Sequence, residues 1–192
     1  MPHGASVRIA AMSAARAEAQ TLALIDSGCD VVVSFGLAGA LDRRLSPGDL
    51  IVADSIVTSD GTVFPTRVLE LADAHVGRVV GSDTIVATAE DKARMSGLAV
   101  DMESHGVARA ARARGVPVVV VRAIADRASS SLPKSALVAI RANGEPGVSR
   151  VLAALAKRPW EIVALMRLAG ESRAAHAALC RVAPALVRLL AG

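Results

Sequence analysis

The chain has 192 residues, of which 53% are hydrophobic, and its formal net charge is +4. A chain of this length forms one domain, or one domain with an appendage, and it can bury a large core. Aromatic residues make up only 2%, which argues against a nucleic-acid-binding protein that stacks bases on aromatic rings. The positive charge is concentrated in residues 150–192, which hold seven basic and two acidic side chains.

The cysteines and the first residues bear on the cell compartment. Cys29 and Cys180 lie far apart and match no metal-ligand spacing, which predicts a reduced, cytoplasmic protein without a metal site. The first eight residues contain no long apolar segment of the kind found in signal peptides. No apolar run in the sequence reaches the length of a membrane-spanning helix.

Helices and strands are predicted to alternate through the first half of the chain. The predicted elements are a helix over 13–27, a buried strand over 31–35, a glycine turn at 36–39, a strand over 50–58, a hairpin partner over 62–64, a short helix over 68–75, extended runs over 78–80 and 84–87, and a helix over 89–95. Gly28 ends the first helix.

The stretch from 98 to 128 reads as strand, helix and strand. A short apolar run ends at Asp101, and a helix with an apolar side follows until Gly115. The β-branched run 118–121 predicts a strand buried on both faces. Asp101 and Glu103 follow the first strand, and Asp126 follows the second. If the strands are parallel neighbours, these carboxylates face one crevice at the end of the sheet.

Beyond residue 126 the sequence is mainly helical. Loops are expected at 128–133 and 143–147, followed by helices over 148–156, 159–169 and 171–190, the last one interrupted or kinked at Pro184. The whole pattern predicts an α/β fold with a mixed, largely parallel central sheet and helices on both faces. We expect an α/β domain over 1–147 and a basic helical extension over 148–192, packed on or beside it.

Each candidate carboxylate has a structural and a functional interpretation. Asp101 is placed to cap the following helix. Glu103 has no obvious structural task, although a helix dipole favours an acid in the first turn. Asp126 has Arg122 four residues before it and Arg127 after it, and it is either a strand-end carboxylate paired with an arginine or a general acid whose pKa is raised by apolar surroundings.

The glycine turn and the histidines carry weaker signals. The turn at 36–39 would let backbone amides approach a phosphate or a sugar, but a simple strand-to-helix turn explains it equally well. His105 and His176 have no partners at ligand spacing, and we interpret both as structural or solvated.

Several motifs together resemble one enzyme superfamily. The segments 100–108 (VDMESHGVA) and 116–126 (VPVVVVRAIAD), preceded by 34–41 (SFGLAGAL) and 47–53 (PGDLIVA), resemble the purine nucleoside phosphorylase and methylthioadenosine/S-adenosylhomocysteine nucleosidase superfamily. The resemblance spans about residues 10–128. The tail segments 136–144 and 155–159 make the chain most similar to the hopanoid-associated phosphorylases, also described as adenosylhopane nucleosidases.

The resemblance implies a role for each matching residue. Asp126 would protonate N7 of the purine as the glycosidic bond breaks, which suits a poor leaving group and a sugar that becomes cationic. Glu103 would accept hydrogen bonds from the ribose hydroxyls, with Met102 packed beside the sugar. The base pocket would contain Thr84, Ile85 and Val86, and the loop near the sugar and the nucleophile would contain Gly36, Ala38 and Gly39.

The chain also departs from the superfamily pattern. Full-length relatives carry an additional N-terminal strand and a loop whose glutamate activates the attacking water, and no glutamate occupies the matching position here. Ile85 replaces a residue that is commonly aromatic, and Ala125 replaces a common serine. A sheet without that strand would expose an edge unless a partner chain covers it.

The resemblance implies cleavage of the N-glycosidic bond of an adenosyl nucleoside, adenosylhopane in hopanoid biosynthesis, by phosphate or by water. It implies a homo-oligomer and no cofactor, with phosphate as the potential co-substrate. The alternatives are a methylthioadenosine/S-adenosylhomocysteine nucleosidase and a degenerate nucleoside-binding protein without turnover. The basic tail helices would either lie on an anionic membrane surface or pack on the sheet.

Overall fold

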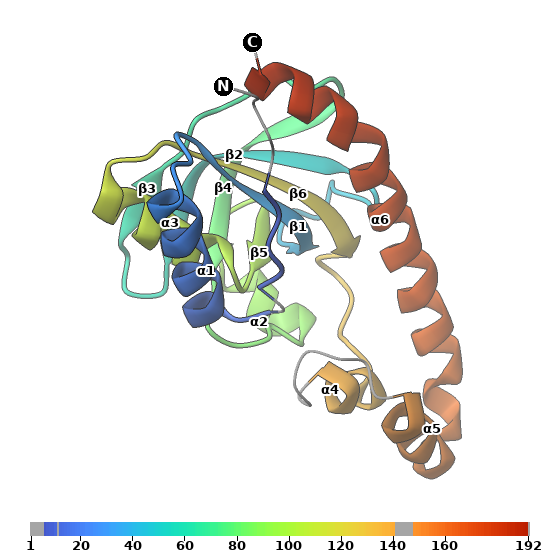
Figure 1. Ribbon diagram of the computed structural model, residues 1–192. Helices are drawn as coiled ribbons and strands as arrows, with labels where there is room; N and C mark the ends of the chain where they lie inside the picture. Colours follow the sequence, from blue (N-terminus) through green and yellow to red (C-terminus); the bar gives the residue numbers. More distant parts are fainter. Residues whose placement is uncertain (1–5, 11, 141–147, 192) are drawn as a thin grey trace.

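The computed structural model describes residues 6–10, 12–140 and 148–191 of the chain. Its strands are β1 (Val32–Ala40), β2 (Leu50–Thr58), β3 (Val63–Pro65), β4 (Ala74–Gly81), β5 (Ala99–Asp101) and β6 (Val118–Asp126). Its helices are α1 (Ala14–Asp26), α2 (Ala89–Ala93), α3 (Ser104–Arg114), α4 (Lys134–Ile140), α5 (Val148–Lys157), the 3₁₀ turn η1 (Pro159–Glu161) and α6 (Ile162–Ala191). Figure 1 shows the sheet between α1 and α3 on one side and α6 on the other.

The six strands form one mixed sheet that closes on itself. Their order is β3-β2-β4-β5-β1-β6, and β2 pairs with β6 as well. The long pairings of β1 with β6 and of β2 with β4 are parallel, whereas β5 runs antiparallel to β1 and β2 runs antiparallel to β6. The predicted α/β class with a mixed sheet and helices on both faces is confirmed. The closure through β2 and β6 was not predicted.

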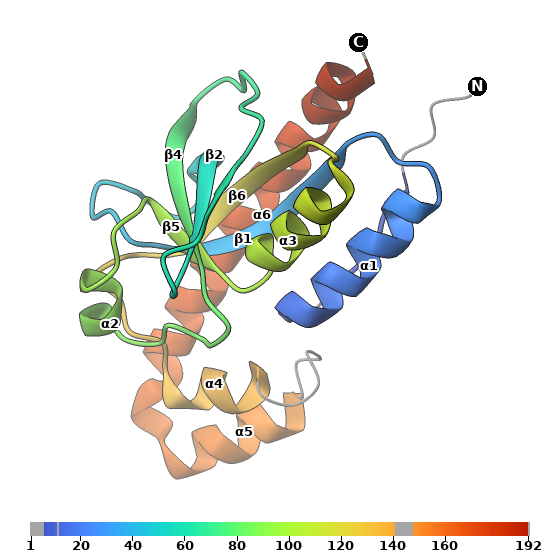
Figure 2. The ribbon, with the colours of Figure 1, turned by 90° about the vertical axis from the view of Figure 1, so that its left-hand side faces the viewer.

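Two apolar layers hold the helices against the sheet. As the β-branched run predicts, residues 118–121 of β6 are buried on both faces. On one face, Ala108 and Ala111 of α3 pack over Val120. On the opposite face, the second half of α6 packs over the sheet (Figure 2). The α6 residues in these clusters are Ala175, Ala178, Leu179, Val182 and Leu186. The tail helix therefore covers one face of the sheet.

The contact between α1 and α3 depends on a glycine. A Cβ atom on Gly106 would stand 2.2 Å from the carbonyl oxygen of Ala14, so only glycine lets the two helices approach this closely. Glu18 accepts a hydrogen bond of 3.0 Å from Arg109 Nε across the same interface. Ser13 caps α1 by accepting a hydrogen bond from the backbone of Arg16.

Some predicted elements were wrong. The glycine turn expected at 36–39 is absent, because β1 continues through these residues to Ala40 and pairs there with β5 and β6. The helix expected over 68–75 is absent, and residues 74–81 form β4 because this segment completes the sheet between β2 and β5. The helices expected over 159–169 and 171–190 form one helix, α6, which continues through Gly170 and Pro184. Packing of its second half on the sheet outweighs the poor helix propensity of both residues. Helix α4 was not predicted, and the loop at 143–147 lies outside the described residues.

No helix in the described part of the chain has the length and apolar character required to cross a membrane. The division into two domains at residue 147 stays a prediction.

Candidate active site

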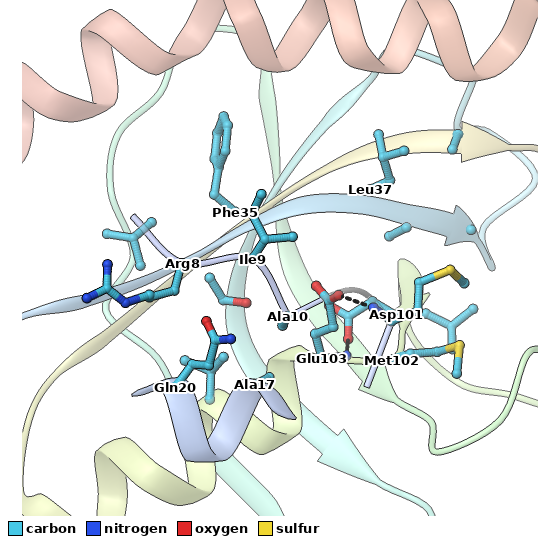
Figure 3. Close-up of a pocket in the computed structure, with 18 of the residues that line it drawn as sticks. Arg8, Ile9, Ala10, Ala17, Gln20, Phe35, Leu37, Asp101, Met102 and Glu103 are labelled. Atoms are coloured by element: carbon cyan, nitrogen blue, oxygen red, sulfur yellow. Dashed lines mark hydrogen bonds between the residues drawn. The ribbon is translucent and has the colours of Figure 1, made fainter. Parts of the chain in front are cut away.

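A cavity of about 680 Å³ opens where β1, β5 and β6 end. Its wall also includes the N-terminal segment 6–10, α1, residues 84–86 and two residues of α6. The predicted site residues that line it are Ala38, Gly39, Thr84, Ile85, Val86, Met102, Glu103 and Asp126. The structure therefore brings eight of the nine predicted positions to one cavity, although their roles stay predictions. Figure 3 shows Met102 and Glu103 beside the N-terminal segment, with Phe35 and Leu37 on β1.

The ends of β5 and β6 meet at the cavity, but not as the ends of neighbouring parallel strands. They were predicted to be parallel neighbours, but β1 lies between β5 and β6, and β5 runs antiparallel to it. Gly39 of β1 is the register partner of Val100 on one side and of Asp126 on the other. Because β5 is only three residues long, its end lies across β1 from the end of β6.

A β-bulge turns Asp126 toward the cavity. In the pairing of β1 with β6, Ala38 is opposite Ile124, whereas Gly39 is opposite Asp126, so Ala125 is an extra residue. Strand residues alternate between the two faces, and one extra residue reverses that alternation. Asp126 and Arg122, four residues apart, therefore do not point to the same face of the sheet as they would in a regular strand.

Asp101, which is also a residue of the cavity wall, forms a buried ion pair with Arg122. Arg122 Nε donates to Asp101 Oδ2, and Arg122 Nη2 donates to Ser34 Oγ at 2.6 Å. Asp101 Oδ1 accepts from the backbone of Ser104 at 3.0 Å and from its hydroxyl at 2.7 Å, in agreement with its interpretation as a capping residue. Burial alone would raise the pKa of Asp101, but the Arg122 charge and the Ser104 hydrogen bonds hold it below its ordinary value.

This ion pair corrects two expectations. Arg122 is the partner of Asp101, so the hypothesis that it pairs with Asp126 is wrong. Gly36 is the one predicted site residue that is not part of the cavity wall. A Cβ atom on Gly36 would stand 3.6 Å from Arg122 Nη1, so Gly36 lies against the buried guanidinium instead.

Glu103 is held at the cavity by the N-terminal segment. It precedes α3 but makes no side-chain capping bond. Its Oε1 atom accepts a hydrogen bond of 2.6 Å from the backbone N–H of Met12. Met12 has a φ of 59°, an uncommon left-handed conformation for a residue other than glycine. Glu103 is therefore a carboxylate of the cavity wall that the backbone of Met12 holds in place.

Asp126 is paired with a lysine that the sequence did not reveal. Lys92 of α2 is only 1% exposed, and its Nζ atom donates to Asp126 Oδ2. Burial raises the pKa of Asp126, and the Lys92 hydrogen bond and charge oppose that rise. Lys92 lies in a charged run, between Asp91 and Arg94, that resembles a solvated helix surface. No pattern in the sequence links it to a residue 34 positions away.

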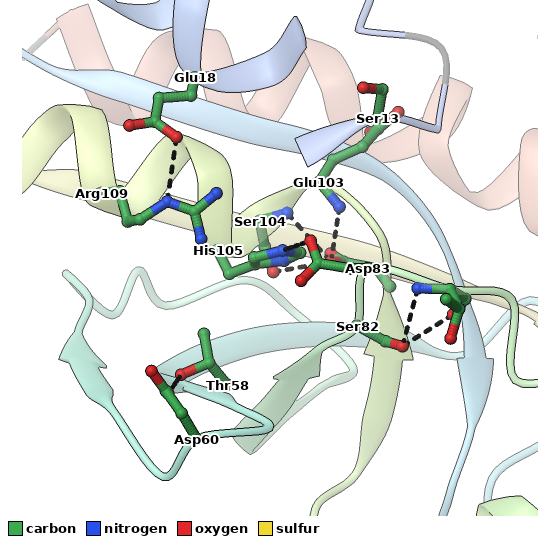
Figure 4. Close-up of polar contacts among 12 residues, drawn as sticks. Ser13, Glu18, Thr58, Asp60, Ser82, Asp83, Glu103, Ser104, His105 and Arg109 are labelled. Carbon is green, nitrogen blue, oxygen red and sulfur yellow. Dashed lines mark hydrogen bonds and ion pairs between the residues drawn. The ribbon is translucent and has the colours of Figure 1, made fainter. Parts of the chain in front are cut away.

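The two histidines have no catalytic surroundings. His105 is buried on α3, and its Nε2 atom lies 3.0 Å from Asp83 Oδ1 (Figure 4). This contact lowers the pKa of Asp83 through its hydrogen bond and the His105 charge. His176 is exposed on α6. Among the described residues, no group of three or more His, Cys, Asp or Glu side chains could hold a metal ion.

Comparison with known proteins identifies the family. The family model of the phosphorylase superfamily matches residues 3–71 and 66–158, which together cover most of the chain. The chain belongs to the phosphorylase superfamily. Its curated relatives include the 5'-methylthioadenosine/S-adenosylhomocysteine nucleosidase of Staphylococcus aureus (strain JH9), which is 26% identical over 138 residues. That match covers 55% of this chain and 60% of the relative, so this superfamily member spans less than two thirds of the relative's length.

Solved structures confirm the superfamily fold. The Helicobacter pylori 5'-methylthioadenosine/S-adenosylhomocysteine nucleosidase matches with a TM-score of 0.54 and 23% identity, over 61% of this chain and 64% of that one. The Streptococcus pneumoniae enzyme with a transition-state inhibitor has a TM-score of 0.55 and 22% identity, over 73% and 76% of the two chains. An aspartate-to-asparagine mutant of the Helicobacter pylori enzyme, with 5'-methylthioadenosine in its active site, has a TM-score of 0.56 and 20% identity, over 76% and 77%.

Proposed function

We propose that this phosphorylase-superfamily chain cleaves the N-glycosidic bond of an adenosyl nucleoside and releases adenine. One observation carries the proposal: Glu103 and Asp126 lie at the same cavity, on opposite sides of β1. The cavity volume of about 680 Å³ is in the range of small-molecule sites. Superfamily membership gives the class of reaction, and the two carboxylates give it a chemical basis.

The proposed reaction uses the two carboxylates at opposite ends of the nucleoside. Asp126 transfers a proton to N7 of the purine, and the electron pair of the bond between N9 and C1' moves onto the base. Glu103 accepts hydrogen bonds from the ribose hydroxyls, and its negative charge stabilises the positive charge that develops on the sugar. Water or phosphate then bonds to C1' and loses one proton. The backbone at Ala38 and Gly39 lies on the cavity wall for that nucleophile.

The remaining predicted residues fit the same arrangement. Thr84, Ile85 and Val86 contribute wall on the base side, and Met102 lies beside Glu103 on the sugar side. Burial raises the pKa of Asp126, which makes its carboxylate a better base and favours its role in carrying a proton to the purine.

The proposed substrate is adenosylhopane, which carries a large apolar group on its sugar. Two features support it: the segments 136–144 and 155–159 resemble the hopanoid-associated phosphorylases in sequence, and the cavity wall carries apolar side chains besides the carboxylates. These side chains include Ile9, Phe35, Leu37 and Leu168. The alternative is the activity printed for the Staphylococcus aureus relative, cleavage of methylthioadenosine or S-adenosylhomocysteine. A degenerate binding protein is the second alternative.

A membrane surface is the proposed docking site of the enzyme. The first turns of α6 and the preceding 3₁₀ turn expose apolar side chains, with Trp160 at 72% and Val163 at 73% exposure. The exposed apolar residues are Trp160, Ile162, Val163 and Met166, and the basic residues nearby in the sequence are Lys157, Arg158 and Arg167. Apolar side chains among basic ones suit an anionic lipid surface. Such a surface would deliver a lipid-linked nucleoside to the cavity.

Vesicle binding tests this docking site. Val163→Asp is expected to weaken binding to anionic vesicles severalfold, while Val187→Asp, a 56% exposed position near the other end of α6, leaves it unchanged. Equal vesicle binding by both variants and the wild type would contradict the proposed membrane-docking surface. Deletion of the whole tail is unsuitable, because α6 supplies core residues such as Leu179. We also propose that the chain forms a homo-oligomer. Light scattering of the purified protein tests this by measuring its molar mass.

Adenine release tests the reaction. Wild-type protein is assayed with adenosylhopane and with S-adenosylhomocysteine, each with and without phosphate. Release from adenosylhopane alone supports the proposed substrate, and its dependence on phosphate identifies the nucleophile. Asp126→Asn is expected to abolish release in a folded protein, and Glu103→Gln is expected to lower kcat/KM. Wild-type release from Asp126→Asn would exclude Asp126 as the acid, and binding of adenine without any release would favour the degenerate protein.

A further inference from the structure

Lys92 is a buried cation whose donors are all engaged. Its Nζ atom donates to Asp126 Oδ2, to the carbonyl oxygen of Arg127 at 2.8 Å and to that of Ser130 at 3.3 Å. An ammonium group has three N–H donors, whereas a neutral amine has two. Three oxygen atoms around one nitrogen give an ammonium group an acceptor for each of its N–H bonds. Burying such a charge costs several kcal/mol unless a counter-ion compensates it, and Asp126 is that counter-ion.

The other charged groups near Asp126 have partners of their own, so Lys92 is the residue placed to give Asp126 a proton. Arg127 directs its guanidinium away, with Nη1 3.3 Å from Ser46 Oγ and Nε 3.7 Å from Glu171 of α6. Glu103 shares the cavity wall but is bonded to the backbone of residue 12. Among the described residues, no other cationic side chain forms an ion pair with Asp126.

The resting pair thus consists of an ammonium and a carboxylate, which has a consequence for the proposed chemistry. A carboxylate has no proton to give to a purine. The ammonium can pass one to Asp126 without any change in the total charge of the pair, and onward transfer to the purine leaves the pair with one negative charge beside the protonated base. The structure also shows a route, because Oδ2 of Asp126 meets Lys92 while Oδ1 lies over Gly39, a residue of the cavity wall.

We propose that Lys92 is the proton reservoir of the site: it holds Asp126 in place and supplies the proton that Asp126 passes to the leaving purine. The inference rests on the proposed nucleosidase or phosphorylase activity. A proton moves from Lys92 Nζ to the Asp126 carboxylate and from there to N7, while the bond between N9 and C1' breaks and its electrons stay on adenine. Lys92 is then a neutral amine. The proton lost by the attacking water or phosphate restores the ammonium, so the cycle balances.

The raised pKa of Asp126 fits this sequence of transfers. Burial makes the Asp126 carboxylate a stronger base, so it can take up the proton that it passes on. Lys92 does not touch the nucleoside in this scheme, so it is a positioning residue that acts through Asp126.

Two substitutions separate proton supply from simple charge pairing. Lys92→Arg keeps the positive charge beside Asp126 but cannot release a proton at any accessible pH. Lys92→Met removes both the positive charge and the proton that Lys92 could transfer. The proposal predicts that each variant loses about 100-fold or more in kcat, the range of general acid catalysis, with a much smaller change in KM. Lys134→Met, at an exposed lysine of α4, is the control with unchanged kcat.

The alternative, in which Asp126 rests as a protonated acid, predicts the opposite pattern. Lys92 would then oppose protonation, so Lys92→Met would keep or raise kcat and extend the active range to higher pH. Wild-type kcat in Lys92→Arg would likewise overturn the proposal, since it would show that only the charge is needed.

A measurement independent of turnover reads the charge state directly. Carbon NMR of the Asp126 carboxyl group, assigned with Asp126→Asn, is expected to show a carboxylate at neutral pH in the wild type and in Lys92→Arg, and uptake of a proton at higher pH in Lys92→Met. A protonated Asp126 in the resting wild type would overturn the inference. If the wild type releases no adenine from any nucleoside, the proposed function fails and the relay with it. If it does, and the Lys92 variants match it, only the relay fails.

Discussion

Loss of the buried guanidinium is expected to destabilise the chain strongly and to invert the pH dependence of its stability. Arg122 is fully buried and donates to Asp101, to Ser34 and to the backbone of Val121. Arg122→Leu leaves Asp101 buried with hydrogen bonds from Ser104 but without its counter-ion. Breaking a buried pair by removing one partner costs about 3–5 kcal/mol.

Protonation of Asp101 limits the free energy of unfolding that is lost in Arg122→Leu. An aspartate with an ordinary pKa near 4 needs about 4 kcal/mol to take up a proton at pH 7, at about 1.4 kcal/mol for each pH unit. Once the penalty of the unpaired carboxylate exceeds this value, Asp101 protonates instead. The expected loss in the free energy of unfolding at neutral pH is therefore about 3–4 kcal/mol.

The sign of the pH dependence follows from the same group. In the wild type the lowered pKa of Asp101 stabilises the fold above the unfolded-state pKa, and this contribution is lost as the pH falls through the folded-state pKa. In Arg122→Leu burial raises the pKa of Asp101, so the folded variant binds more protons than its unfolded state. Its free energy of unfolding should therefore increase as the pH falls from about 7 to about 5.

Urea unfolding followed by far-ultraviolet circular dichroism measures both quantities. Arg114→Leu is the matched control, because Arg114 lies 3.1 Å from Asp26 in a half-exposed surface pair, whose loss costs about 0–1 kcal/mol. If Arg122→Leu unfolds within about 1 kcal/mol of the control, or if its stability falls with pH as the wild type's does, the reasoning about the buried pair is refuted.

Two glycine substitutions test close packing at different places. Gly106→Ala pushes a Cβ atom against the backbone of Ala14, so thermal unfolding should show a loss of about 2–3 kcal/mol, whereas Gly170→Ala, with open space around it, should be neutral or stabilising by up to about 1 kcal/mol. Equal effects would contradict the contact between α1 and α3. Gly39→Ala would place a Cβ atom 3.1 Å from Asp126 Oδ1, so steady-state kinetics should show a fall in kcat of about tenfold with little loss of stability. An unchanged kcat would show that the carboxylate position tolerates the displacement.

The sheet strands were the most predictable part of the chain. Continuous apolar runs such as 118–121 identify strands that helices cover on both faces, and the Asp-Gly turn at residues 60 and 61 identifies the hairpin between β2 and β3. The helix predicted over 68–75 is wrong because its apolar spacing fits a helix, whereas residues 68–73 form no helix or strand and β4 begins at Ala74, between β2 and β5. The local sequence of a segment does not show which strands it will pair with in the folded sheet.

The site was predictable in position but not in its ion pairs. The motifs around Glu103 and Asp126 brought the right residues to one cavity, since they follow short, recognisable strands. The partners depend on geometry that spacing cannot reveal. The bulge at Ala125 separates Asp126 from Arg122, and the helix that carries Lys92 reaches Asp126 only in the folded chain.

The closed sheet also constrains how the chain can be made. Strand β2 completes the ring only when Val52 pairs with Val121 of β6, so a ribosome must synthesise more than 120 residues before any arrangement of the early strands can close. Until then β1 and β2 lack a neighbour, and their unpaired backbone groups can join strands of other nascent chains. Contacts between residues so distant in sequence form slowly. The yield of folded protein should therefore depend on what shields those two strands during translation, more than on the stability of the finished ring.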